Sequence, residues 1–284
     1  MYLSYFTDEA HDDFAQALRL GTSWGLHCAE VRTVDGINIL DMTDEQVERA
    51  KRLLDQYDMK VSALATPYLK CRMPGSSGAN TGPMHGAKEL SYDDHLRLLK
   101  RGVQLAEYLG TSRIRVFSFW RVSDDSFWPI LEEAVTATIN ACAGSGVTPC
   151  LENEGACCIG TASELAQAAH KLTDERLKFI WDPGNSSYSG QFASSEDRAV
   201  FGPRIGLVHI KECRIDADTN EKVPCPPGKG ITDYGKELSY IASVYNGPIT
   251  LEPHYRPNGD MTEGMRQCIE SLKELCEKQG ITLE

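Results

Sequence analysis

Short apolar runs alternate with longer amphipathic segments along the whole chain. A short run of apolar and β-branched residues bounded by Gly, Pro, Asn or Asp is typical of a buried strand. Eight such runs are predicted to be strands, at residues 2–6, 28–34, 61–65, 113–119, 147–151, 177–181, 205–210 and 249–251. Helical spacing of apolar residues follows each run and predicts helices at 14–20, 43–57, 91–109, 126–143, 164–172, 195–201, 234–244 and 261–279.

Local signals place several of these boundaries. Thr43 is a good N-cap, and Gln46 three residues later completes a capping box. Gly21 and Gly110 are predicted to end the first and third helices because glycine readily adopts the left-handed conformation of a helix C-cap. Pro67 is predicted to stop the third strand, since proline cannot donate to a strand ladder.

Two long segments, 70–88 and 215–231, are rich in Gly, Pro and polar residues and are predicted to be loops. Loops of this length inside a compact domain are often functional. The first is either a lid over a site or an insertion without that role, and the sequence does not separate the two.

Eight strand–helix units in 284 residues correspond to about 35 residues per unit, the size of a βα repeat. No composition shift divides the chain. The predicted fold is a single-domain (β/α)8 TIM barrel over residues 1–284. The structural alternative is a doubly wound open sheet, but no G-x-G-x-x-G follows the first strand.

Composition excludes several classes of protein. The net charge of −12 and the pI of about 5.1 argue against a nucleic-acid partner, because an acidic surface repels phosphate. No apolar run is long enough to span a membrane. The N-terminus lacks the pattern of a signal peptide, so a cytoplasmic location is expected. The ten cysteines match no zinc motif and are interpreted as reduced, mostly structural thiols.

Four ligand-type side chains lie at the ends of successive predicted strands: Glu152, Asp182, His209 and Glu252. Their separations of 30, 27 and 43 residues correspond to one unit, one unit, and one unit plus the long loop. Each residue alone could be a helix cap or a surface charge. Together, three carboxylates and an imidazole on strands about 4.8 Å apart predict a site for one divalent ion, Mn²⁺, Mg²⁺, Co²⁺ or Zn²⁺.

The motifs around these residues resemble those of the sugar isomerase/epimerase branch of the xylose isomerase-like TIM barrels, which includes tagatose 3-epimerase, inosose dehydratase and hydroxypyruvate isomerase. The resemblance covers essentially the whole chain. It rests on 151-Leu-Glu-Asn-153, 181-Trp-Asp-Pro-Gly-Asn-185, 208-Val-His-Ile-Lys-Glu-212, 251-Leu-Glu-Pro-253 and 228-Gly-Lys-Gly-Ile-Thr-Asp-Tyr-234. By this resemblance, the four strand-end residues are the metal ligands.

The resemblance also implies catalytic roles for Glu152 and Glu252. In the family's epimerases the matching glutamates move the proton beside a carbonyl, through a metal-stabilised enediolate. The chain departs from that pattern at Asn185, where the ketose epimerases have a histidine, and at Arg214, one residue short of their arginine.

Five residues are predicted to contact substrate, on the basis of this resemblance or of strand alternation. They are Asn185, Lys211, Arg214, Glu154 and Arg32. For Arg32 a salt bridge to Glu30 or Asp8 is an equal alternative.

The predicted function is a divalent-metal-dependent isomerase or epimerase of carbohydrate metabolism. Its partner is a small sugar, ketose or polyol derivative, and a homo-oligomer is possible. A lyase or dehydratase acting on a keto-sugar or keto-inositol is an alternative on the same scaffold. A non-catalytic sugar-binding barrel and an endonuclease for abasic DNA are further alternatives, the last opposed by the acidic charge.

Overall fold

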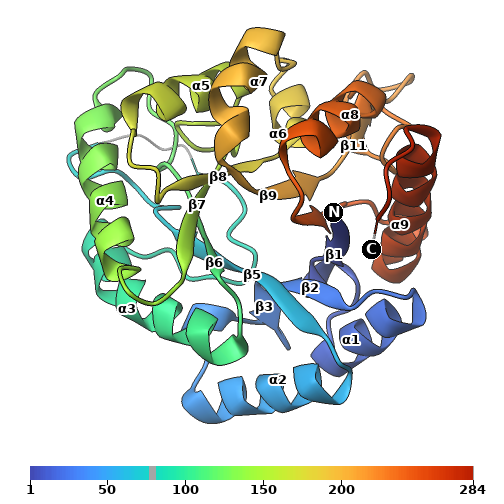
Figure 1. The fold of residues 1–284 in the computed structure, drawn as a ribbon, viewed down its shortest axis with the longest axis horizontal. Helices are drawn as coiled ribbons and strands as arrows, with labels where there is room; N and C mark the ends of the chain where they lie inside the picture. Colours follow the sequence, from blue (N-terminus) through green and yellow to red (C-terminus); the bar gives the residue numbers. More distant parts are fainter. Residues whose placement is uncertain (77–80, 284) are drawn as a thin grey trace.

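Eight parallel strands form the centre of the molecule and helices surround them (Figure 1). The computed structural model describes residues 1–76 and 81–283. The sheet order is β1-β12-β9-β8-β7-β6-β5-β2. These strands are β1 (Tyr2–Tyr5), β2 (Cys28–Val31), β5 (Lys60–Tyr68), β6 (Arg113–Val116), β7 (Thr148–Glu152), β8 (Lys178–Trp181), β9 (Ile205–Ile210) and β12 (Pro248–Leu251).

The two edge strands meet and nearly close the sheet into a barrel. Parallel pairing aligns Tyr5 of β1 with Leu251 of β12, and a parallel bridge joins Phe6 to Glu30 of β2. The predicted TIM barrel is therefore confirmed. All eight strands run in the same direction, so their carboxyl ends gather at one mouth, where this fold builds its active sites.

Side chains of β5, β7, β8 and β9 alternate between two separate apolar layers. In β8, Phe179 and Trp181 belong to the large core between strands and helices, whereas Ile180 belongs to a small cluster with Cys150 and Leu207 on neighbouring strands. This alternation follows from the period of two in a strand.

The helices that cover the strands are α1 (Phe14–Ser23), α2 (Asp44–Gln56), α3 (Tyr92–Leu109), α4 (Phe127–Ala141), α5 (Ala162–Lys171), α6 (Pro183–Tyr188), α7 (Ser195–Phe201), α8 (Tyr234–Val244) and α9 (Met261–Lys278).

Two predicted boundaries are wrong for reasons that lie in the packing. Helix α1 continues through Gly21 to Ser23, because the buried ring of Tyr5 packs against Gly21, and a Cβ there would lie 2.1 Å from the Tyr5 hydroxyl oxygen. Strand β5 continues through Pro67 to Tyr68. The pairing of β5 with β6 shifts register between Leu64 and Tyr68, which lets β5 accommodate a residue without an N–H.

One short helix and two hairpins were not predicted from the sequence. Helix α6 begins directly after Asp182, whose side chain caps it by accepting a hydrogen bond from Asn185 N. The predicted loop 215–231 contains most of an antiparallel hairpin of β10 (Cys213–Ile215) and β11 (Lys222–Pro224). A second hairpin, β3 (Thr33–Val34) with β4 (Ile37–Asn38), follows β2.

Other predictions hold. Thr43 and Gln46 form the capping box of α2, and Gly110 caps α3 in the left-handed conformation. All ten cysteines are free and buried. No helix in the described part of the chain is long and apolar enough to cross a membrane. Residues 77–80 of the predicted loop 70–88 lie outside the described residues.

Candidate metal centre

The four predicted ligands meet at the carboxyl ends of four adjacent strands. Glu152 is the last residue of β7, Asp182 follows β8, His209 is the penultimate residue of β9, and Glu252 follows β12. Each offers one ligand atom, and these atoms all lie within 4.8 Å of one another. All four side chains are buried. Unpaired burial of so much charge would be costly, so this arrangement needs compensating positive charge.

His209 lies between two carboxylates, one on each side of its ring. Its Nε2 is 3.1 Å from Glu30 Oε2, and its Nδ1 is 3.1 Å from Glu152 Oε1 and 4.0 Å from Glu252 Oε2. Hydrogen bonding of a ligand histidine through its second nitrogen is the usual way to orient it toward a metal. Glu30 therefore directs Nδ1 of His209 toward the other ligand candidates.

Three basic side chains neutralise the carboxylates. The Lys211 ammonium lies 2.8 Å from Glu252 Oε2 and 3.1 Å from Asp182 Oδ2. Arg32 Nη1 lies 2.6 Å from Glu252 Oε1, and Arg115 Nη1 lies 3.2 Å from Glu152 Oε2.

Burial and these charges shift the pKa values of three ligand candidates in different directions. Burial alone would raise the pKa of Glu152, but His209 and Arg115 outweigh it and lower that pKa to about 2. Burial raises the pKa of Asp182 to about 6, against the opposing charge of Lys211. Burial opposes the charge of His209, yet Glu30 and Glu152 raise its pKa to about 10.

The residues fit a divalent ion. Asp182 Oδ2 is buried and accepts no hydrogen bond from the described residues, although the Lys211 ammonium forms an ion pair with it. Three carboxylates and one imidazole are a hard-to-borderline donor set. The Glu30 carboxylate lies 3.1 Å from Nε2 of the histidine and can hold the ring in place. A metal at these oxygens would share Asp182 and Glu252 with Lys211.

The backbone of Asp182 is held by a reciprocal pair of hydrogen bonds. Asn153 Nδ2 donates to the Asp182 carbonyl oxygen, and Asp182 N donates to Asn153 Oδ1, both at 2.9 Å. Asn185 Nδ2 donates to the Asn153 carbonyl oxygen at 2.7 Å and to Glu152 Oε1 at 3.4 Å. These hydrogen bonds thus join the carboxyl ends of the neighbouring strands β7 and β8, next to the ligand candidates.

The five residues predicted to contact substrate occupy different surroundings. Asn185 and Lys211 each contact two of the four ligand candidates, and Arg32 contacts one. Glu154 lies 3.6 Å from the Lys70 ammonium. Arg214 is half exposed on the β10–β11 hairpin and pairs with Asp216.

Arg32 forms three ion pairs, and one of them, with Asp8, is a salt bridge that the sequence offered as an alternative. It contacts Asp8, Glu9 and Glu252, whereas the other alternative, Glu30, contacts His209. Strand alternation predicted that Glu30 and Arg32 lie on the same face of a strand. It did not predict the contact between Glu30 and His209, because His209 lies 179 residues away.

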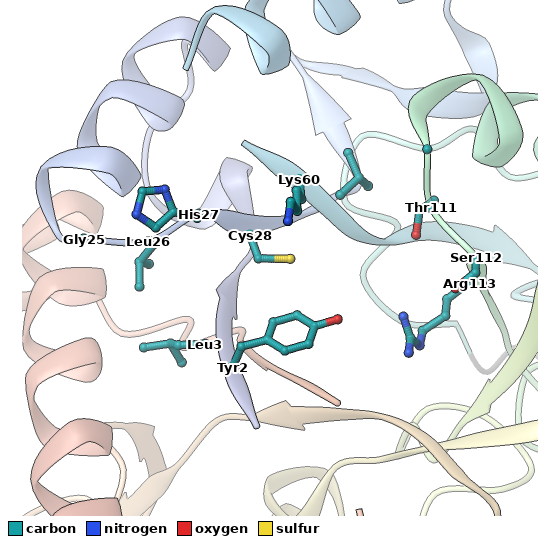
Figure 2. Close-up of a pocket in the computed structure, with 12 residues that line it drawn as sticks. Tyr2, Leu3, Gly25, Leu26, His27, Cys28, Lys60, Thr111, Ser112 and Arg113 are labelled. Carbon is teal, nitrogen blue, oxygen red and sulfur yellow. The ribbon is translucent and has the colours of Figure 1, made fainter. Parts of the chain in front are cut away.

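A large cavity lies at the opposite end of the barrel. It has a volume of about 540 Å³ and is lined at the amino ends of the strands by Tyr2, Cys28, Lys60 and Arg113 (Figure 2). The carboxylates are absent from its lining residues, so this cavity does not serve the chemistry described above. The ligand candidates are at the other mouth.

Comparison with known proteins agrees with this architecture. The family model described as "Xylose isomerase-like TIM barrel" matches residues 18–282. No curated protein sequence matches.

Among solved structures, the IolI protein with a bound zinc atom is 14% identical, with a TM-score of 0.76 over 98% of this chain and 99% of that one. The 3-keto-D-glucoside 4-epimerase YcjR from E. coli is 14% identical, with a TM-score of 0.70 over 98% and 99%. The "probable 3-DHS dehydratase" AsbF from Bacillus anthracis is 15% identical, with a TM-score of 0.70 over 96% and 99%. At these identities the likeness shows the fold.

Proposed function

The chain belongs to the xylose isomerase-like TIM barrels, a family of enzymes, and we propose that it is a divalent-metal-dependent isomerase or epimerase. Its substrate would be a small sugar, ketose or polyol derivative. The proposal rests on one observation: four buried donors from four successive strands place their ligand atoms within 4.8 Å of one another. The zinc of the IolI structure and the epimerase activity of YcjR support the same class.

Glu152, Asp182, His209 and Glu252 would hold the ion. It would supply positive charge that polarises the carbonyl and hydroxyl oxygens of the substrate. The ion's identity among Mn²⁺, Mg²⁺, Co²⁺ and Zn²⁺ is open to measurement, since the donor set accepts each of them.

Proton transfer is assigned to the two glutamates. Burial disfavours the charge on both. Their basic neighbours outweigh burial and lower the pKa of Glu152 to about 2 and that of Glu252 well below its ordinary value. Both are therefore deprotonated at neutral pH, the form that a general base needs. One carboxylate would take the proton beside the substrate carbonyl and so become an acid. For an aldose–ketose isomer the same group would return this proton to the neighbouring carbon. For an epimer the second glutamate would first take a proton from solvent and then deliver it to the opposite face of the substrate.

Lys211 supplies the positive charge closest to both Asp182 and Glu252. It would stabilise the negative charge that develops on the substrate oxygens when the proton leaves. The same ammonium could instead protonate a departing hydroxyl. This position is the specific observation that favours a lyase or dehydratase as the second candidate, and AsbF is an example of that reaction class on this fold.

The first test is metal content. We expect the purified protein to hold divalent metal that is lost in Glu152→Gln and Asp182→Asn and kept in the control Glu48→Gln, whose side chain is exposed on α2. The measurement is elemental analysis after dialysis, with thermal unfolding to check the fold. Wild-type protein that neither contains metal nor binds any of the four ions would contradict the proposal.

The second test separates the reactions. Incubating candidate ketoses and keto-polyols in D₂O with metal-loaded protein should place deuterium beside the carbonyl, as read by NMR. Loss of a hydroxyl with a new ultraviolet-absorbing enone would identify the lyase. Tight sugar binding without any exchange across the panel would indicate a binding protein and end the enzyme assignment.

A further inference from the structure

A second group of ligand-type side chains lies beside the candidate metal centre. Glu9 follows β1, His85 belongs to the segment between β5 and α3, and His254 lies two residues after Glu252. Each offers a ligand atom, and the three atoms lie within 4.8 Å of one another. We propose that these residues form a second divalent cation site of the zinc type, separate from the four-residue centre.

The donor atoms are arranged as such a site requires. His254 Nε2 lies 3.4 Å from Glu9 Oε1 and 3.7 Å from Glu252 Oε1. This nitrogen is buried and has no hydrogen-bond partner among the described residues. The His85 and His254 rings are stacked, with centroids 5.6 Å apart and planes at 18°. Two imidazoles and one carboxylate are a recurring zinc donor set that leaves a position for water or substrate.

The local charge also favours a cation. Asp8, Glu9 and Glu252 surround the guanidinium of Arg32, and Glu252 also pairs with Lys211, so three carboxylates face two cationic side chains. Asp8 Oδ1 is buried and accepts no hydrogen bond from the described part of the chain. A divalent ion next to Glu9 would offset this excess of negative charge.

Both histidines are held in an unusual backbone conformation. His85 has φ of 46° and His254 has φ of 49°, in the left-handed region that only a few per cent of non-glycine residues adopt, His among the more frequent of them. Such strain persists only where surrounding structure maintains it, and it is concentrated at functional sites. Here it brings two imidazoles from segments 169 residues apart to the same carboxylate.

Glu252 connects the two groups. Its Oε2 faces Lys211 and His209, whereas its Oε1 faces Arg32 and His254. The second cation would therefore lie close to the proposed reaction centre, where paired metals can stabilise two substrate oxygens. It would also attach the segment that carries His85 to the barrel mouth, where Thr33 Oγ1 already donates to the His85 carbonyl oxygen at 3.0 Å.

The test is the number of zinc ions bound per chain. Metal-free protein is loaded with Zn²⁺, separated from free metal and analysed for zinc, with far-UV circular dichroism to confirm folding. Two ions are expected in the wild type and one in His85→Gln, His254→Gln and Asp182→Asn. The control His27→Gln, an exposed histidine near the other end of the barrel, should keep two.

The wild type and the four variants distinguish failure of this proposal from failure of the proposed function, on which it does not depend. One ion that Asp182→Asn removes and His85→Gln retains would overturn the second site and leave the first intact. One ion that His85→Gln removes and Asp182→Asn retains would support the second site and contradict the first. Two ions that persist in both histidine variants would place the second ion elsewhere and refute the proposal. Cobalt titration of the same variants by visible absorption gives an independent count.

Discussion

Glu30 is a buried carboxylate that influences the protonation of a second buried side chain, His209. It is a fully buried carboxylate in a strand of otherwise small and apolar residues, and it contacts His209 Nε2. Its neighbouring carboxylates raise the pKa of His209 to about 10, so a metal must displace one proton from the ring. The carboxylate at Nε2 favours keeping the proton there and leaving the lone pair on Nδ1. That nitrogen faces Glu152, on the side where the metal is proposed to bind.

The change Glu30→Gln should weaken metal binding without removing a ligand. An amide can accept the Nε2 hydrogen bond but lacks the charge that raises the basicity of the imidazole. Loss of such an outer partner typically reduces affinity about 10- to 100-fold. Isothermal titration with Zn²⁺ or Mn²⁺ measures it. Glu48→Gln, exposed on α2, is the matched control, and equal affinity in both variants would show that Glu30 does not orient the histidine.

The placement of Lys211 and Arg32 also belongs to the residue scale. Both were predicted to contact substrate, and both contact Glu252 in the structure. Their contact with substrate stays a prediction. What the structure adds is that each already balances a buried carboxylate, so removing either would leave that carboxylate uncompensated.

At the scale of elements, packing contacts override local signals. Gly21 looks like a helix end, yet α1 passes through it because only a residue without a side chain fits against Tyr5. Asp182 looks like a strand-end ligand, and it also caps α6, which the sequence analysis missed. Six residues from Pro183 to Tyr188 are too few to show a helical period, so this helix has no clear apolar pattern.

The change Gly21→Ala is therefore expected to destabilise the protein although alanine is the better helix former. The new methyl group would lie 2.1 Å from the Tyr5 hydroxyl oxygen, and overpacking of this kind costs about 1–3 kcal/mol. Urea unfolding measures the change. The matched control is Gly235→Ala in α8, where the nearest atom is the flexible end of Gln279 at 3.1 Å. We expect that variant to be neutral or more stable, and equal behaviour of the two would contradict the packing argument.

At the scale of the whole molecule, one buried histidine should make global stability depend on pH. His95 is fully buried in α3, and neither ring nitrogen has a hydrogen-bond partner among the described residues. Burial lowers its pKa from 6.5 to about 4. The folded state thus favours the neutral ring, and the unfolded state takes up a proton first as the pH falls. The stabilisation is complete above pH 6.5 and is lost between pH 6.5 and about 4.

We expect this single group to remove about 2 kcal/mol of unfolding free energy between pH 7 and pH 5. His95→Leu should lose correspondingly less stability over that interval, whatever its stability at pH 7. Urea unfolding at both pH values measures the difference. His170→Leu, at an exposed position on α5, is the control and should follow the wild type. Parallel pH profiles for His95→Leu and the wild type would contradict the assignment.

The sequence by itself determined the barrel and four of the residues at its mouth. Strand and helix periods are local, so eight units could be counted, and ligand-type residues at successive strand ends must meet once the sheet curves. For the same reason the capping box at Thr43 and the span of α7 were predictable.

Only the tertiary structure decided which distant groups face these residues. Glu30 meets His209, Arg32 meets Glu252, and His85 meets His254 across separations of 179, 220 and 169 residues. The period of a strand indicates which face a side chain occupies but not which strand closes the barrel beside it. Contacts from loops carry no period at all, so the His85 and His254 pair had no signal in the sequence. Their partners are set by barrel closure and by backbone conformations that only the folded chain maintains.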